Sequence, residues 1–445
     1  MQIAMRVSFA QRGVDIDCVK RFFRHSKISW SIAFLYATSL GGFPLISTIP
    51  VIFELESRPI SVVYRAFFVF LSAIVFLWEG ILKKYIYIGK CLIPFLFIWI
   101  LLIMRLAWEY LYPSSNIMVY PIDEYILMTM GIGFIPMCAF FVRPNTVTLE
   151  ASFWCSLLLS VLALVALLYA NTILDLKYTA SGRLSTEVLN PISFGRLGAS
   201  VAILSVVYLH GRNPFRCSFQ SVSSSIIGYI LLFFGIGVCI ASASKGPLVS
   251  LAIVLVVYSI YSLNGICKRL KTLIASLLLL SVILVTFYFN IDTFIQPITR
   301  IATTFYFEDE SSVERIEMIR NGWKQFLDNP ISGSALVELN MGSYPHNIVV
   351  ESFMATGIIG GLLLLAIVII SLHASWHLIR AGTGYNWVGL LFIQCLIGEM
   401  FSGSIFCSAS IWYYSAAVIA MDNFLRNPRI RNDIFRKLKP SSINI

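Results

Sequence analysis

Charged residues are scarce in this sequence. Only 13% of its 445 residues are Asp, Glu, Lys or Arg, whereas 58% are hydrophobic. A soluble domain carries about 25% charged residues. The mean hydropathy of +0.81 is correspondingly high. This composition excludes a water-soluble enzyme.

A long polar block is also missing. Apolar runs near the length of a bilayer span recur from residue 28 to residue 424, which excludes a soluble domain held by a single anchor. The runs predict an all-α, polytopic integral membrane protein with about 12 transmembrane helices. The expected helices cover residues 28–50, 61–82, 85–104, 124–142, 149–170, 192–210, 224–242, 247–263, 272–290, 348–372, 385–403 and 405–424.

Metal-type cysteine spacing and glycine-rich phosphate loops are absent as well. The nine cysteines lie in apolar runs or beside basic loops, so neither a zinc site nor a disulfide framework is expected. The carboxylates on the expected outer side form no evident metal site. We therefore expect no bound metal, no other cofactor and no nucleotide hydrolysis. No cleavable signal peptide is recognisable near the N-terminus.

The charges that are present indicate an orientation. With the N-terminus inside, 22 of the 33 Lys and Arg residues fall on the cytoplasmic side, as the positive-inside tendency requires. An even number of spans then leaves both termini inside. The expected organisation is a cytoplasmic tail (1–27), helices 1 to 9 (28–290), a large outer loop (291–347), helices 10 to 12 (348–424) and a basic cytoplasmic tail (425–445).

The large outer loop contains a helical pattern. Ser311 and Glu314 have the spacing of a capping box, and Ile316, Ile319, Trp323 and Phe326 follow at spacings of three, four and three until Asn329-Pro330 ends the pattern. This predicts an amphipathic helix along the outer membrane face or over a cavity. A solvated helix that only tethers the loop is the alternative.

Eleven cations lie on the outer side or within spans, where orientation gives no reason for them. Several come from separate loops: Arg183, Arg196, Lys245, Arg315 and Arg320. Each one taken alone could be a snorkelling anchor. Together they are better explained by a polyanionic ligand such as a lipid pyrophosphate, because Arg matches phosphate oxygens with two parallel hydrogen bonds.

His346 is the only histidine expected on the outer side. It stands in Tyr344-Pro345-His346-Asn347, where His346 or Asn347 is expected to cap the start of the tenth helix. Backbone N–H groups there favour an anion beside the imidazole. The alternative is a capping residue whose ring packs at the interface.

Two acids lie inside apolar spans near the outer side. Glu351 follows His346 by five residues, and Glu399 is close to the outer end of the eleventh helix. Either could be an active acid or base, but we favour counter-ions for buried arginines. Gly357, Gly360 and Gly361 are expected to allow close helix packing.

Several motifs in their order resemble the bacterial O-antigen ligase and O-antigen polymerase superfamily. The resemblance covers about residues 180–365 and rests on Gly182-Arg183-Leu184, Asn190-Pro191-Ile192, Ser244-Lys245-Gly246, Arg315 through Trp323 to Asn329-Pro330-Ile331-Ser332-Gly333, Tyr344-Pro345-His346-Asn347, Glu351, and Thr356-Gly357-Ile358-Ile359-Gly360. One departure is visible, since the family often has Arg at the position of Lys245. Lysine offers a point charge in place of a two-bond fork.

The resemblance implies a glycosyltransferase of the bacterial inner membrane, whose active site faces the periplasm. Its donor would be an undecaprenyl-pyrophosphate-linked oligosaccharide, its acceptor another glycolipid, and a chain-length regulator protein a further partner. No nucleic acid is expected. The implied catalytic residues are His346 as base and Arg183, Arg196, Arg315 and Arg320 as charge stabilisers, with substrate-binding roles for Lys245, Asn347, Glu351 and Tyr344.

Three functions remain open from the sequence. A polymerase transfers the glycan to another lipid-linked repeat unit, whereas a ligase transfers it to lipid A-core. The Pro-His-Asn-x-x-x-Glu form and the Asn-Pro-Ile segment favour a polymerase. A flippase or exporter would need binding charges near the bilayer midplane and repeated halves, whereas these charges gather at one face.

Overall fold

The computed structural model describes residues 28–87, 89–114, 117–173, 184–186, 189–210, 222–261, 310–381 and 384–426. The helices in these ranges, with η for a π-helical stretch, are α3 (Trp30–Ala37), η1 (Thr38–Gly42), α4 (Phe43–Ile46), α5 (Thr48–Phe53), α6 (Ser57–Ile74), η2 (Val75–Leu82), α7 (Leu92–Leu111), α8 (Ile122–Ile126), η3 (Leu127–Phe134), α9 (Ile135–Phe140), α10 (Thr146–Ile173), α11 (Pro191–His210), α12 (Val222–Ala241), α13 (Lys245–Tyr261), α16 (Glu310–Asp328), α17 (Ile348–Ala381), α18 (Asn386–Ser402) and α19 (Ala409–Arg426). No β-strand occurs in the same ranges, so the predicted all-α class is confirmed.

In the part of the chain that the structure describes, seven helical stretches are long and apolar enough to cross a membrane. They are Trp30–Phe53, Ser57–Leu82, Leu92–Leu111, Ile122–Phe140, Thr146–Ala170, Pro191–Leu209 and Ile348–Ala381, and three shorter apolar helices cover Ser225–Ala241, Lys245–Ile260 and Asn386–Ser402. Every predicted span coincides with a helix except 272–290, which lies outside the described residues. The chain is therefore a polytopic membrane protein.

The third expected helix begins later than predicted. The prediction was 85–104, whereas α7 covers Leu92–Leu111. The residues before α7 are extended instead: Ile86 forms an isolated antiparallel bridge with Val142, and Tyr87 N–H donates to Phe141 O over 2.9 Å. Hydropathy did not reveal this partner, because the pairing segment lies more than fifty residues away in the sequence.

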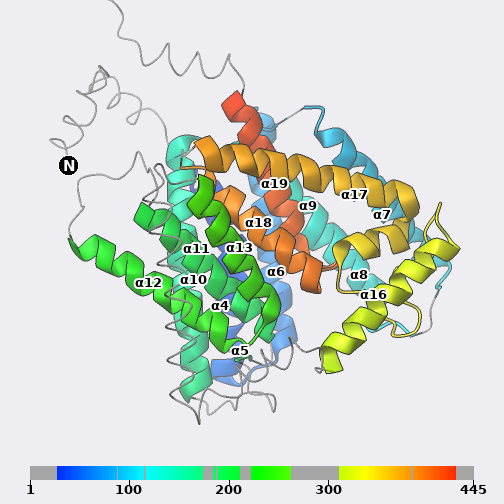
Figure 1. Ribbon diagram of the computed structural model, residues 1–445. Helices are drawn as coiled ribbons and strands as arrows, with labels where there is room; N and C mark the ends of the chain where they lie inside the picture. The colour runs from blue at the N-terminus through cyan, green and yellow to red at the C-terminus, as the bar shows by residue number, and fades with distance from the viewer. Residues whose placement is uncertain are drawn as a thin grey trace, which may run out of the picture.

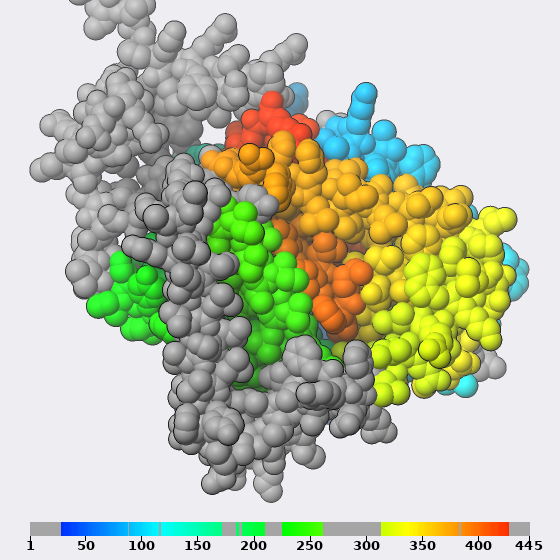
Figure 2. Space-filling view, in the orientation of Figure 1, coloured from blue at the N-terminus to red at the C-terminus, as the bar shows by residue number. Residues whose placement is uncertain are grey.

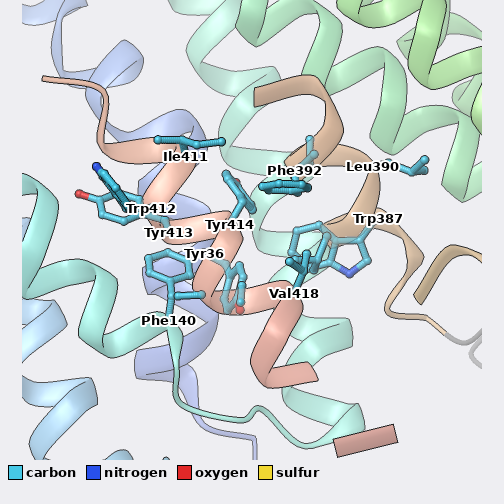
Figure 3. Close-up of a cluster of buried hydrophobic side chains, with 14 of the residues drawn as sticks. Tyr36, Phe140, Trp387, Leu390, Phe392, Ile411, Trp412, Tyr413, Tyr414 and Val418 are labelled. Carbon is cyan, nitrogen blue, oxygen red and sulfur yellow. The ribbon is translucent and has the colours of Figure 1, made fainter. Parts of the chain in front are cut away.

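The bundle is built around α19. Every residue from Ile411 to Met421 is buried, as expected for a helix surrounded by others. The Tyr413 ring stacks on Phe140 with centroids 5.0 Å apart, and Trp412 packs against Trp99 at 5.0 Å. Figure 3 shows Phe140, Trp412 and Tyr413 among the aromatic side chains that meet around α19. In Figure 1, α10 to α13 lie on one side of α18 and α19, and α7, α8 and α16 on the other.

The predicted helix in the large loop is confirmed as α16, but it packs through a different face. It begins at Glu310, one residue before the expected cap Ser311, and ends at Asp328 beside the expected Asn329-Pro330 stop. The residues that α16 buries are Met318, Gly322 and Gln325. The expected apolar face is only partly packed, since Ile316 and Trp323 are exposed.

The face of α16 directed away from the bundle carries an apolar stripe. Val313, Ile316, Trp323 and Leu327 are exposed and lie on one side of the helix at helical spacing, and exposed Ile331 follows them. Figure 2 shows α16, in yellow, on the surface beside the gold part of α17. An exposed apolar stripe on a helix next to membrane spans is suited to the membrane surface.

A break in α17 fixes the loop that follows α16. Gly357 has φ 68° and ψ −166°, a conformation that is essentially restricted to glycine. On one side of the break Ile358 N–H donates to Pro330 O over 2.8 Å, and on the other Ser334 N–H donates to Met354 O over 2.8 Å. Gly357 therefore has a conformational role in addition to the close packing expected from the sequence.

Gly357→Ala should destabilise the docked loop. A Cβ at this position would lie 2.2 Å from Ile331 O, and the backbone conformation alone costs a non-glycine residue about 1 to 3 kcal/mol. We expect a lower thermal unfolding temperature in detergent and faster proteolysis between residues 329 and 345. Gly237→Ala is the matched control, because a Cβ there would meet nothing within 4 Å. Equal stability of the two variants would contradict this role of Gly357.

Candidate functional site

His346 lies just before α17, in a backbone conformation that needs support. Its φ is 56°, in the left-handed region that few non-glycine residues adopt. The following residue supplies the predicted helix cap: Asn347 Oδ1 accepts hydrogen bonds from Val349 N–H at 3.0 Å and Val350 N–H at 3.1 Å. The cap leaves the imidazole of His346 outside the helix, with the Tyr344 ring edge-on at 4.6 Å between centroids.

Asn347 also connects two helices. Its Nδ2 donates to Met400 O, near the end of α18, over 3.0 Å. All the polar groups of the Asn347 side chain thus have partners within the protein. The bonds explain its conformation fully, whereas the substrate-binding role expected for it stays a prediction.

Glu351 fixes the same junction from inside the bundle. Its carboxylate is fully buried and accepts hydrogen bonds from Ser404 Oγ at 2.7 Å and Ile405 N–H at 2.6 Å. The counter-ion role favoured from the sequence is therefore wrong for Glu351, since a hydroxyl and a backbone amide bind its oxygens where an arginine was expected. These partners come from the turn between α18 and α19, which the sequence did not place beside α17.

Glu399, in contrast, is the expected counter-ion. Its Oε1 lies 2.7 Å from Arg196 Nη1, and its side chain is completely buried. Arg196 itself is about one quarter exposed and lies against Gly398, where a Cβ would come within 3.0 Å of Nε. The absence of a side chain at Gly398 provides the space for this guanidinium.

The ion pair uses only one nitrogen of Arg196. Nε and Nη2 are buried and have no hydrogen-bond partner among the described residues. These two nitrogens form the edge of a guanidinium that can donate two parallel bonds to a carboxylate or phosphate. Glu399 therefore compensates the charge of Arg196 without using this bidentate edge, which lies against Gly398.

Residues of three further motifs lie near the start of α11: Leu184, Asn190 and the turn that leads to Lys245. Asn190 Oδ1 accepts from Ser193 N–H over 2.8 Å and caps the helix. Gly195 lies so close to the turn before α13 that a Cβ would be 2.5 Å from Ser242 Oγ, and Leu184 N–H donates to Ala241 O in the same region. Lys245, half-buried, is the first residue of α13. Arg183, which precedes Leu184, lies outside the described residues.

Helix α16 brings Arg315 into the electrostatic environment of His346. Burial, and secondly the positive charge of Arg315, lower the pKa of His346 to about 4. The imidazole is therefore neutral at pH 7, and its Nδ1 is buried without a hydrogen-bond partner in the described part of the chain. Burial also raises the pKa of Tyr344, so that its hydroxyl stays protonated beside the imidazole. Arg320, on the same helix, is exposed.

One residue that holds the site in place was not singled out from the sequence. Arg105 of α7 is buried, forms an ion pair with Glu109 at 2.9 Å and donates to Ser334 O over 2.6 Å. It thereby joins α7 to the loop between α16 and α17. An arginine inside an apolar run with an acid four residues later was the available signal. Its partner Ser334 is 229 residues away.

The arrangement can bind an anion and accept a proton. A neutral imidazole stands at a helix start, and the guanidinium groups of Arg196 and Arg315 approach the same end of the bundle from two helices. Within the described ranges no group of three or more His, Cys, Asp or Glu side chains could hold a metal ion. The imidazole and the guanidinium groups can together supply a general base and fixed positive charges.

Comparison with protein families supports the resemblance seen in the sequence. Residues 230–365 match the family model described as O-antigen ligase. This range includes Lys245, Arg315, Arg320, His346 and Glu351, whereas Arg183 and Arg196 precede it. The predicted similarity to the O-antigen ligase and polymerase superfamily is confirmed over these residues. A search of curated proteins finds no match.

Glu351→Ala distinguishes a structural from a substrate-binding role. Removing the carboxylate leaves the buried Ser404 hydroxyl and Ile405 amide without an acceptor, which should lower the stability by about 2 kcal/mol or more. We expect a lower thermal unfolding temperature in detergent. Glu351→Gln, which keeps one acceptor oxygen for these donors, should have a smaller effect. A variant of unchanged stability that has lost activity would assign Glu351 to the substrate.

Proposed function

We propose that this protein is an O-antigen (surface polysaccharide) polymerase, a metal-independent membrane glycosyltransferase. It transfers a glycan from undecaprenyl pyrophosphate to a sugar hydroxyl of another lipid-linked repeat unit. The observation that carries the proposal is the position of His346 at the start of α17, with Arg315 acting on it from α16 and the Arg196–Glu399 pair at the adjacent end of α18. The family match over residues 230–365 supports the class of reaction.

The reaction has two requirements that these residues meet. The acceptor hydroxyl attacks the anomeric carbon, the bond from that carbon to the pyrophosphate oxygen breaks, and the proton of the hydroxyl goes to His346. The leaving undecaprenyl pyrophosphate gains negative charge at the same time. Arg196, Arg315 and Arg320, with Arg183 and Lys245, stabilise this charge. Tyr344, Asn347 and Glu351 are proposed as substrate-binding residues.

Substrate binding also adjusts the basicity of His346. A base with a pKa of about 4 is unprotonated at pH 7 but accepts a proton weakly. A bound pyrophosphate beside Arg315 offsets the positive charge that helps to lower this pKa. The pKa of His346 then rises in the complex, so the imidazole becomes a better base when the donor is present.

The site is proposed to face the periplasm, with the protein in the bacterial inner membrane. The positive-inside count supports this orientation, because His346 and the cations around it lie on the side with fewer Lys and Arg residues. A lipid-linked donor could then approach within the membrane, and the exposed apolar stripe of α16 would lie at the outer surface.

An O-antigen ligase is the alternative, and the family match supports both functions equally. A ligase uses the same donor and the same leaving group, so the residues above keep their roles. The acceptor alone differs: lipid A-core replaces a second lipid-linked repeat unit.

The proposal is tested with the purified protein in lipid nanodiscs and an undecaprenyl-pyrophosphate-linked repeat unit. A ladder of longer lipid-linked glycans identifies a polymerase, and product formed only after lipid A-core is added identifies a ligase. His346→Ala should abolish transfer in either case while the protein still folds and accumulates. Near-normal transfer by this variant would remove His346 from the mechanism.

The pH profile gives a second test of His346. The base form is lost as the pH falls through its pKa, so kcat/KM of the wild type should fall only near pH 4. Arg315→Gln removes a positive neighbour, raises the pKa of His346 and should move the acid limb to higher pH. The limb of kcat, which reports the substrate complex, should also lie above that of kcat/KM. An acid limb that Arg315→Gln leaves unchanged would contradict this assignment.

Arg196→Lys tests the proposed phosphate clamp. Lysine can still form an ion pair with Glu399, but it cannot provide the two parallel donors of the Nε and Nη2 edge. Transfer should therefore fall nearly as far as in Arg196→Ala, by roughly ten- to a hundredfold. The glycan ladder at matched membrane expression measures this.

Lys245→Arg is the control for the clamp, and it should be accepted because related sequences often have Arg there. The same Arg→Lys comparison applies to Arg183, Arg315 and Arg320. Full activity of all four Arg→Lys variants would favour simple anchors, since either head group reaches the interface. Normal activity of every Arg→Ala variant would eliminate the clamp.

A further inference from the structure

Arg65 is a charged residue on the inward face of a membrane-spanning helix. In α6 it precedes Phe68 by three residues and Ser72 by seven, and both of these side chains are buried. Phe67 and Phe70, on other sides of α6, are exposed and suited to face lipid. Arg65 is itself half-buried. Helical spacing therefore places Arg65 on the same face of α6 as Phe68 and Ser72.

The guanidinium of Arg65 forms no ion pair within the described part of the chain. The nearby carboxylate of Glu124 is bound by Arg58, whose Nη2 lies 3.3 Å from Glu124 Oε1 at the start of α6. No hydrogen bond and no ion pair joins Arg65 to any residue that the structure describes. A charged side chain inside a span is costly unless it is paired, so an unpaired one indicates a ligand or pathway.

Arg65 is close to the turn that holds Glu351. It interacts electrostatically with Glu124 and with the thiol of Cys407. Cys407 lies in the turn between α18 and α19, where its N–H bonds to Ser404 Oγ. The same Ser404 hydroxyl donates to Glu351, which follows His346 by five residues. Arg65 therefore lies near the turn that binds Glu351 in the first turns of α17.

Arg65 belongs to a different helix from the residues of the proposed donor clamp. Helix α6 packs against α3, α4, α5, α9 and the π-helical stretches η2 and η3, and among the described helices it has no substantial packing with α11 or α16. Those two helices carry Arg196 and Arg315. A phosphate bound by Arg65 would thus be held by a different helix from a pyrophosphate bound by Arg196.

We propose that Arg65 binds a phosphate of the acceptor glycolipid and so provides a second anion-binding position beside the one for the donor. This inference rests on the proposed function, because transfer between two lipid-linked glycans brings two phosphate-bearing head groups to one base. Arg65 is then a positioning residue for the acceptor. The donor phosphates remain with Arg196 and Arg315.

The experiment uses farnesyl pyrophosphate as a soluble lipid pyrophosphate and counts the equivalents that bind the full chain in nanodiscs by native mass spectrometry. The wild type should bind two, and Arg65→Gln one. Arg196→Gln should also bind one, and the double variant none. Arg58→Gln is the matched control on the same helix face, since Arg58 is 85% exposed and already paired. It should bind two.

The kinetics of glycan transfer then show whether the anion-binding position at Arg65 serves the acceptor or the donor. Arg65→Gln should raise the KM for the acceptor by roughly ten- to a hundredfold, the effect of losing a charge-assisted hydrogen bond, and leave the KM for the donor unchanged. Arg65→Lys should recover part of the loss. A rise in the donor KM alone would overturn the acceptor assignment.

The outcomes separate this inference from the proposed function. A single equivalent on the wild type, or two on Arg65→Gln, would overturn the second position. The single equivalent expected on Arg65→Gln also shows that this variant is folded. If the wild type binds two equivalents and only Arg65 variants lose one, but no glycan is transferred to either acceptor, the anion position stands and the proposed function fails.

Discussion

The hydrogen bonds at the start of α17 are the constraint on which the rest of the site depends. Glu351 binds the turn after α18, and Asn347 binds the last turn of α18 itself. The Glu351 carboxylate is fully buried, so it must find partners within the protein because water cannot replace them. Satisfying these groups sets α17 and α18 in one register. His346 and the Arg196–Glu399 pair are positioned by that register.

The large loop is attached to the same junction through backbone groups. The break at Gly357 exposes the ends of two helical segments, and residues 330 to 334 bind both of them. Arg105 fixes this segment from α7 through Ser334 O. Because α16 precedes the segment and packs on the first turns of α17, Arg315 comes close to His346. A backbone feature distant from the imidazole thus contributes to its low pKa.

Among the described residues, the positive charges at this end of the bundle are only partly compensated by carboxylates. Glu399 offsets the charge of Arg196 but occupies a single nitrogen, and Glu351 is bound by neutral donors. Arg65 and Arg315 form no ion pair with a carboxylate among the described residues. An excess of guanidinium groups in an apolar setting is unfavourable by itself. The phosphate groups of the proposed substrates would offset this charge.

The sequence by itself determined the features that depend on neighbouring residues. Hydropathy predicted the helices, and the helix in the large loop followed from its spacing and its Asn-Pro stop. The cap at Asn347 depends on residues two and three positions later, and Glu399 was identified as a counter-ion because an acid in an apolar run needs one. Only the tertiary structure decided which distant groups meet. Contacts between helices far apart in the chain decided the partners of Glu351 and Arg105, the buried face of α16 and the inward position of Arg65. Periodicity within a helix could not predict them, because it carries no information about the neighbour that the helix faces.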